Sequence, residues 1–166
     1  MAHTMTAPHG VPKQLDWKAG LLAGLIAGLV FLIAEMLMVW LIQGESPWGP
    51  PRMIAAMVLG RDVLPPPATF DLGIVLAALA VHFILAIIYG FIVGWLLHWS
   101  HDLGSALLIG AVFGLAIYLI NFYLIAPAAF PWFAMARNWI SAVSHTLFGI
   151  AAAGVYMRLR HTSESA

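Results

Sequence analysis

Four polar side chains lie inside otherwise apolar stretches of this sequence, and their types are those that bind protons, metals or hydrogen-bonding ligands. They are a carboxyl group, an amide and two imidazoles: Glu35, Asn121, His82 and His145. Glu35 is the only formal charge that lies away from the ends of these stretches. A carboxylate inside a bilayer is costly, so such residues normally face protein or water and mark function. We therefore expect the chemistry of the chain at these four positions.

The composition indicates an integral membrane protein. Of the 166 residues, 63% are hydrophobic and only 8% are charged, with a formal net charge of zero. Soluble domains carry about 25% charged residues. A soluble globule, a disordered chain and a nucleic-acid binder are thereby excluded, and the lipid bilayer is the expected partner. The absence of cysteine excludes disulfides, thiolate metal sites and cysteine nucleophiles.

Four apolar stretches are long enough to cross a membrane, which takes about 20 residues. We predict transmembrane helices at 19–42, 72–97, 103–126 and 137–157, with loose tails at 1–14 and 161–166, in a single domain of residues 1–166. A helix at 51–60, with Pro51 at its start and Gly60 at its end, is too short to span and should lie at the interface. The predicted fold class is all-α, an integral membrane four-helix bundle.

The two halves of the sequence resemble each other, which predicts two repeated helix hairpins. An offset of 86 positions aligns three residues of each half, Gly24, Gly28 and Glu35 with Gly110, Gly114 and Asn121. The glycines belong to GxxxG patterns, which also occur at Gly20-x-x-x-Gly24 and Gly90-x-x-x-Gly94. Small residues at this spacing let membrane helices approach closely. They predict a compact bundle, a homodimer or a place in a larger membrane complex.

Helix geometry places the four polar residues at similar depth on inward faces. Seven residues make nearly two helical turns, so Glu35 shares a face with Gly24 and Gly28. With a rise of about 1.5 Å per residue, the four side chains lie about 8 to 15 Å inside the outer helix ends. We therefore predict one intramembrane polar cluster between the four helices.

Three functions are open for this cluster. The first is an accessory or structural role, in which a protonated Glu35 hydrogen-bonds His82 while Asn121 bonds His145. The second is a cofactor site, with haem b held by His82 and His145, or a divalent metal held by His and Glu. The third is a small proton-linked transporter acting as a dimer, with Glu35 and the histidines as proton carriers. No catalytic residue is assigned, because no phosphate loop, zinc-protease pattern or nucleophile elbow occurs, and we do not expect an enzyme.

Basic and aromatic residues predict the orientation. Four of the basic residues flank the two chain ends, namely Lys13, Lys18, Arg158 and Arg160. Three lie on the opposite face, namely Arg52, Arg61 and Arg137. This bias favours both termini in the cytoplasm. Two of the outer arginines follow a Pro-Trp pair, and we expect these residues to be interfacial anchors: Arg52, Arg137, Trp48 and Trp132.

Several segments resemble a family of small, functionally uncharacterised bacterial four-span membrane proteins. The segments are Gly-Glu-Ser-Pro-Trp (44–48), Pro-Arg-Met-Ile-Ala-Ala-Met-Val-Leu-Gly (51–60), Val-Leu-Pro-Pro-Pro-Ala-Thr-Phe-Asp (63–71) and Asn-Phe-Tyr-Leu-Ile-Ala-Pro-Ala-Ala-Phe-Pro-Trp-Phe (121–133). Members of that family often carry a sodium:proline symporter label, but true symporters of that type have more than twice as many spans. The chain also has a looser similarity to YagU-like inner-membrane proteins. The resemblance implies a multi-pass protein of the bacterial inner membrane and assigns no functional residues.

Overall fold

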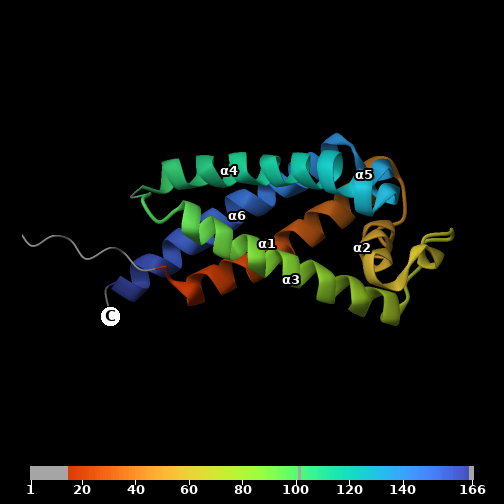
Figure 1. Ribbon diagram of the computed structural model, residues 1–166, viewed down its shortest axis with the longest axis horizontal. Coiled ribbons are helices and arrows are strands. Elements are labelled where there is room, and N and C mark those ends of the chain that lie inside the picture. Colours follow the sequence, from red (N-terminus) through yellow and green to blue (C-terminus); the bar gives the residue numbers. More distant parts are fainter. Residues whose placement is uncertain (1–14, 101, 165–166) are drawn as a thin grey trace, which may run out of the picture.

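The computed structural model describes residues 15–100 and 102–164, with side chains described up to residue 160 (Figure 1). Every regular element in these ranges is helical. In chain order they are α1 (Trp17–Met38), the π-helical η1 (Val39–Gln43), α2 (Gly49–Leu59), the 3-10 turn η2 (Arg61–Val63), α3 (Leu72–Leu96), α4 (Leu103–Leu119), the π-helical η3 (Ile120–Ile125), α5 (Ala126–Ala129), the 3-10 segment η4 (Pro131–Ala136) and α6 (Trp139–Glu164).

The prediction of four long apolar helices is confirmed. The stretches that are long and apolar enough to cross a membrane are Trp17–Gln43, Leu72–Leu96, Leu103–Ala129 and Trp139–Arg160. The short helix expected at 51–60 is α2. The predicted loose tail at 161–166 is wrong in part, because α6 continues to Glu164. The predicted tail at 1–14, which includes Lys13, lies outside the described residues, as do residues 165–166.

Three of the four spans begin at an aspartate that caps the helix. The carboxylates of Asp16, Asp71 and Asp102 each accept a hydrogen bond from the backbone N–H three residues further on, at 2.8–2.9 Å. Such a cap satisfies an N–H group that the first helical turn leaves without a partner. Hydrogen bonds from the side chain and backbone of Ser105 hold the pKa of Asp102 below its usual range. Acidic residues thus set where these helices start.

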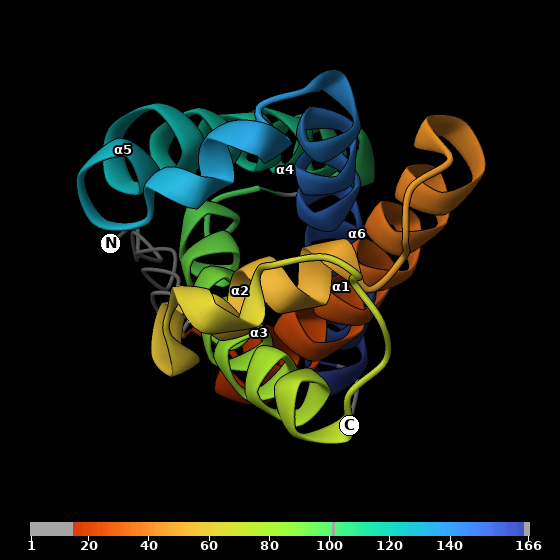
Figure 2. The ribbon, with the colours of Figure 1, turned by 90° about the vertical axis from the view of Figure 1, so that its right-hand side faces the viewer.

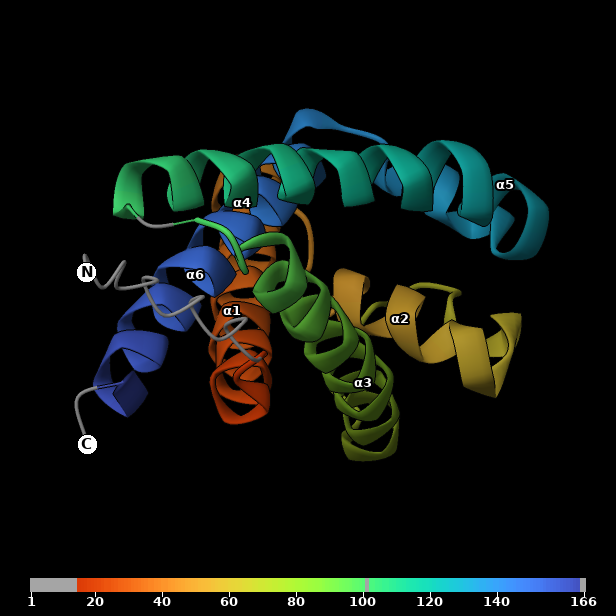
Figure 3. The same cartoon turned by 60° about the vertical axis from the view of Figure 1, so that its left-hand side comes forward.

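The helices do not pack in the order in which they follow along the chain. α1 packs against both α3 and α6, and α4 packs against the other side of α6. Figure 3 shows α1 lying between α6 and α3. α3 and α4 barely touch, although they are consecutive in the sequence. The spatial order is therefore α3, α1, α6, α4, with a seam between the two outer helices.

Glycines lie where helix backbones approach most closely. A methyl group on Gly24 of α1 would lie 2.5 Å from the carbonyl oxygen of Ala86 in α3. On the second pair of helices, a methyl group on Gly114 of α4 would collide with the carbonyl group of His145 in α6. Contacts of this kind replace the hydrophobic effect as a source of helix association in lipid. They hold α1 on α3 and α4 on α6.

Hydrogen bonds join the helices at both ends of the molecule. The start of α1, the end of α6 and the connection between α3 and α4 lie at one end, and α2 and α5 lie at the other (Figure 1). At the first end, the buried guanidinium of Arg160 donates to the carbonyl groups of Leu97 and Ser100. At the second end, α2 lies across the spans (Figure 2). There Trp132 Nε1 donates to the carbonyl oxygen of Met53 at 3.0 Å, which ties η4 to α2.

Candidate binding cavity

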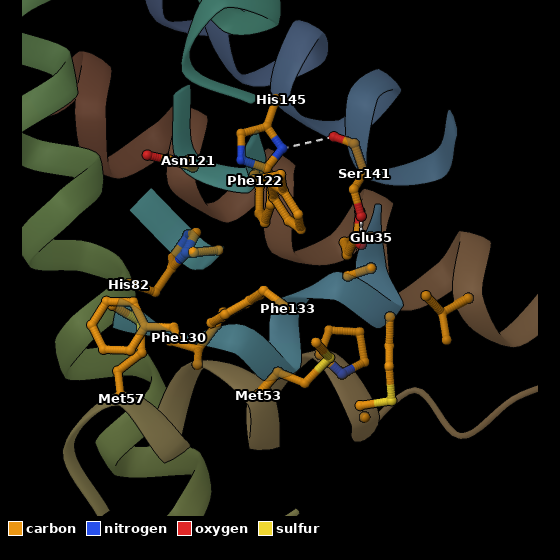
Figure 4. Close-up of a pocket in the computed structure, with 18 of the residues that line it drawn as sticks. Glu35, Met53, Met57, His82, Asn121, Phe122, Phe130, Phe133, Ser141 and His145 are labelled. Carbon is orange, nitrogen blue, oxygen red and sulfur yellow. Dashed lines mark hydrogen bonds between the residues drawn. The ribbon is translucent and has the colours of Figure 1, made fainter. Parts of the chain in front are cut away.

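A cavity of about 470 Å³ lies among the four spans at the end that α2 covers. All four members of the predicted polar cluster line it, each from a different span: Glu35 from α1, His82 from α3, Asn121 from η3 at the end of α4, and His145 from α6. Figure 4 shows His82 and His145 beside a common space, with Met53 and Met57 of α2 on the side opposite His145. Most of the remaining wall is apolar.

Glu35 is buried, with 7% of its surface exposed, and only one of its carboxyl oxygens has a hydrogen-bond partner. Ser141 Oγ donates to Glu35 Oε1 at 2.8 Å. Oε2 has no partner among the described residues. The predicted bond between Glu35 and His82 is wrong, because α6 brings Ser141 against α1 and His82 bonds elsewhere. A buried polar atom without a partner costs free energy, and the hydroxyl group of Ser144, which is also buried and is a neighbour of the carboxyl group, is placed to supply one.

Both histidines use one ring nitrogen for a backbone carbonyl group. His82 Nε2 lies 3.0 Å from the oxygen of Gly28, and this bond joins α3 to α1. His145 Nδ1 lies 2.7 Å from the oxygen of Ser141, one turn earlier in α6. A carbonyl oxygen only accepts, so each of these nitrogens carries the hydrogen. The other nitrogen of each neutral ring is then an acceptor.

Asn121 bonds Tyr89, and the predicted bond between Asn121 and His145 is wrong. Tyr89 Oη donates to Asn121 Oδ1 at 3.2 Å. His145 instead bonds a carbonyl group of its own helix. This partner lies one turn away and does not depend on which helix packs alongside. The Tyr89–Asn121 bond crosses the seam between α3 and the end of α4.

Aromatic rings surround the two imidazoles. Phe31 stacks on His82 with ring centroids 5.3 Å apart and meets His145 edge-on at 4.8 Å. Phe122 and Tyr118 contact His145 with centroid separations of 5.6 and 5.8 Å. Electrostatic interactions and hydrogen bonds are stronger in such apolar surroundings than in water.

Neither a haem nor a metal ion fits these side chains as they stand. The Phe31 ring contacts both imidazoles, so a haem held by His82 and His145 together would have to displace it. Within residues 15–100 and 102–160, no three His, Asp or Glu side chains gather closely enough to hold a metal ion. Zinc sites use three or four protein ligands. The arrangement of side chains therefore gives the cofactor hypothesis no support.

The predicted interfacial anchors have partners within the chain. Arg52 donates from Nη1 to the carbonyl oxygen of Val63 at 2.8 Å and from Nε to that of Thr69 at 3.1 Å. It thereby holds the segment after α2 in place. The other three pairs are Arg137 above the Tyr123 ring, Trp48 edge-on to Phe70, and Trp132 bonded to Met53. That these residues lie at a membrane interface remains a prediction.

Two groups of cavity residues were not assigned by the sequence. Ser141 and Tyr89 share helix faces with His145 and His82, at spacings of four and seven residues, and this spacing was the available signal. Met53 and Met57 reach the cavity only because α2 lies across the spans. No pattern in the sequence pairs α2 with η4, so the cover could not be foreseen.

Comparisons with known proteins do not place this chain in a family. A scan against protein-family models, a search of curated proteins and a search of solved structures each found no match. The resemblance to small bacterial four-span proteins therefore stays a prediction. The four apolar helices indicate a membrane protein, and any further assignment depends on the geometry of the cavity.

Proposed function

We propose that this protein is a multi-pass membrane protein that binds a small, mostly apolar molecule in the cavity beneath α2. The cavity itself carries the proposal, since it measures about 470 Å³ and combines an apolar wall with polar groups from all four spans. Small-molecule sites typically occupy about 300–1,000 Å³ and have this composition. The polar cluster would orient the ligand, and the apolar wall would supply most of the affinity.

A purely structural role for the polar cluster has weaker support. Networks that hold elements together satisfy their polar atoms, because partly satisfied networks are destabilising. Glu35 hydrogen-bonds Ser141 and no other member of the predicted cluster, and the Nδ1 bond of His145 stays within its own helix. Both features suit a cluster that is completed by a ligand.

Proton-linked transport is a second candidate, favoured by the carboxyl group of Glu35. An intramembrane carboxyl group that lines a cavity is the type of residue that carries protons in transporters. Proteoliposomes with an imposed proton gradient would test it. An unchanged flux of an organic solute after Glu35→Gln would exclude this mechanism.

The methionines offer a direct test of ligand binding. The side chains of Met53 and Met57 line the cavity, whereas Met135 at its rim is 72% exposed and Met157 is buried in the core. We expect tetraphenylmethane, a neutral apolar probe, to shift the methyl NMR signals of the two cavity methionines, Met53 and Met57, in a saturable way. The Met157 signal should stay in place and serves as the internal control. If the Met53 and Met57 signals shift only in proportion to probe concentration, in parallel with that of the exposed Met135, the probe is simply partitioning into lipid, and the proposal is overturned.

We also propose that the bundle consists of two related hairpins, α1 with α3 and α4 with α6. The glycines aligned by the offset of 86 make corresponding contacts. Gly24 faces the carbonyl group of Ala86, and Gly110 faces that of Gly149. Ala86 and Gly149 each lie four residues after the histidine of their helix. The GxxxG glycines would then drive association within each hairpin.

A bacterial inner membrane with both chain ends in the cytoplasm is the proposed location. The start of α1 and the end of α6 lie at the same end of the molecule, where Lys18, Arg158 and Arg160 also lie. Positive residues favour the cytoplasmic side. Because the chain has no cysteine, variants with one introduced cysteine can report on which side of the membrane that position lies. We expect a membrane-impermeant maleimide to label Asp62→Cys and not Arg158→Cys in intact spheroplasts. The reverse result would invert the orientation.

A further inference from the structure

We infer that the cavity binds a lipophilic organic cation, an ammonium or phosphonium group carried on an apolar body, with its charge against Glu35. This inference depends on the proposed binding function and specifies its ligand. It is carried by three features of the cavity: a carboxyl group in the wall without a basic partner, aromatic walls and a seam toward the lipid.

The charge of the cavity wall favours a cation. Glu35 is 7% exposed and lines the cavity, and its described hydrogen-bonding neighbours, Ser141 and Ser144, are uncharged. Among the described residues, Arg52 is the one permanently charged base on the wall, and its guanidinium is engaged by the carbonyl groups of Val63 and Thr69. The exposed carboxylate of Glu45 also lines the cavity and offsets the charge of Arg52. Because the described neighbours of Glu35 are hydroxyl groups, a ligand cation would be the counter-ion of its carboxylate form.

The apolar wall is rich in aromatic rings, which attract cations through their faces. Six of the lining residues are aromatic: Phe31, Tyr89, Phe122, Phe130, Phe133 and Phe148. Figure 4 shows Phe122, Phe130 and Phe133 directed into the same space as Glu35 and His82. Phe31 lies one turn before Glu35 on α1. A quaternary ammonium or phosphonium ion surrounded by rings loses little on leaving water, because its charge is diffuse and its substituents are apolar.

The seam between α3 and α4 gives such a ligand a route from the bilayer. Both outer helices line the cavity, yet they barely touch each other. The hydrogen bond from Tyr89 to Asn121 crosses this seam. The opposite route, through the end of the bundle, is covered by α2, which Trp132 ties to η4. A molecule dissolved in lipid would reach the cavity by parting the Tyr89–Asn121 bond.

Three probes of one shape and different charge test the inference: tetraphenylphosphonium, tetraphenylmethane and tetraphenylborate. Binding is followed by the methyl signals of Met53 and Met57 for full-length protein in lipid nanodiscs. Each probe is compared between wild-type protein and Glu35→Gln in the same lipid, so that partitioning into the bilayer cancels. Glutamine keeps an oxygen that accepts the hydrogen bond from Ser141, and the folded state should therefore persist.

We expect Glu35→Gln to weaken tetraphenylphosphonium at least about tenfold, because it removes one partner of a buried charge pair. The affinity for tetraphenylmethane should change less than about twofold, since no charge is involved. Tetraphenylborate should bind better to the variant than to wild-type protein. Asp62→Asn, which removes an exposed carboxylate on η2, is the matched control and should leave all three affinities unchanged.

The outcomes separate the inference from the proposed function. If tetraphenylmethane shifts the cavity methionines but Glu35→Gln leaves the affinity for the phosphonium ion unchanged, the cavity binds ligands and the cation assignment is wrong. If neither probe shifts these signals, both the binding function and its ligand class are wrong. If Glu35→Gln fails to fold, Glu35→Asp provides the test: it keeps the charge, so it should retain selectivity for the cation over the neutral probe, and loss of that selectivity would contradict the inference.

Discussion

Ser141 Oγ lies 2.8 Å from Glu35 Oε1, and this hydrogen bond joins the first and the last of the four spans. The hydroxyl group of Ser144 is the other hydrogen-bonding neighbour of Glu35, so removal of the Ser141 bond leaves Oε1 without its partner. The bond therefore has two effects, because it stabilises the contact between α1 and α6 and fixes the carboxyl group at the cavity wall.

Ser141→Ala should lower the free energy of unfolding by about 0.6–2 kcal/mol. The lower value is typical of hydrogen bonds between membrane helices, and the higher one includes the cost of leaving a buried acceptor unsatisfied. Thermal unfolding in detergent measures the effect. Ser100→Ala is the control, because Ser100 Oγ makes an exposed hydrogen bond to Asp102. Equal stability of the two variants would contradict the importance of the Ser141 bond.

Gly114→Ala should destabilise the contact between α4 and α6 far more than Gly154→Ala. A methyl group on Gly114 would collide with the carbonyl group of His145, and backbone atoms cannot move aside as a side chain can. On Gly154 the nearest atom is Leu107 Cδ2 at 3.5 Å, an ordinary contact. Overpacking costs about 1–3 kcal/mol. Size-exclusion chromatography and thermal unfolding would show the difference, and indistinguishable variants would argue against the close approach of these helices.

Arg160→Ala should release the connection between α3 and α4. Its guanidinium is buried and donates to the carbonyl groups of Leu97 and Ser100. Hydrogen bonds from charged groups contribute about 1.5–3 kcal/mol. Hydrogen exchange measured by mass spectrometry should speed up around residues 97–100. The exposed neighbour Arg158→Ala is the control and should have a smaller effect there, so equal exchange in both variants would refute this role of Arg160.

The cap at Asp102 should make the start of α4 sensitive to acid. Hydrogen bonds from Ser105 hold the pKa of Asp102 below its usual range. A lowered pKa means that the cap is fully effective above the unfolded-state pKa of about 3.9 and is lost as the pH falls through the lower folded-state value. We expect NMR signals of the first turn of α4 to titrate in this acidic range. Asp102→Asn keeps an acceptor that does not titrate, so a matching titration in that variant would contradict the assignment.

The number, length and position of the spans could be predicted from the sequence because they depend on local hydrophobicity. The predicted start at 72 and the observed start of α3 at Leu72 agree, since Asp71 marks the boundary both in composition and as the helix cap. The inward position of Glu35 also follows from local geometry, because it is fixed by spacing from Gly28 on one helix. Both predictions required no knowledge of neighbouring helices.

The hydrogen-bond partners could not be predicted, because they depend on which helices become neighbours. The bond expected between Glu35 and His82 assumed that the carboxyl group faces α3. Instead α1 lies between α3 and α6, so the carboxyl group meets Ser141 while His82 reaches the Gly28 carbonyl group. Apolar helices that are hydrophobic on every side carry little information on their rotation or order. For the same reason, the position of α2 over the cavity could not be predicted.

The packing of α1 against α6 has a consequence for how the protein is made. The chain emerges from the ribosome in sequence order, so α1 enters the membrane well before α6 exists. During that interval the Glu35 carboxyl group has neither its hydroxyl partner nor the wall that α6 gives to the cavity. The cavity can therefore form only when synthesis has passed the last span. A chain that stalls after α4 would leave an acidic side chain in lipid, a feature by which membrane quality control could recognise the unfinished protein.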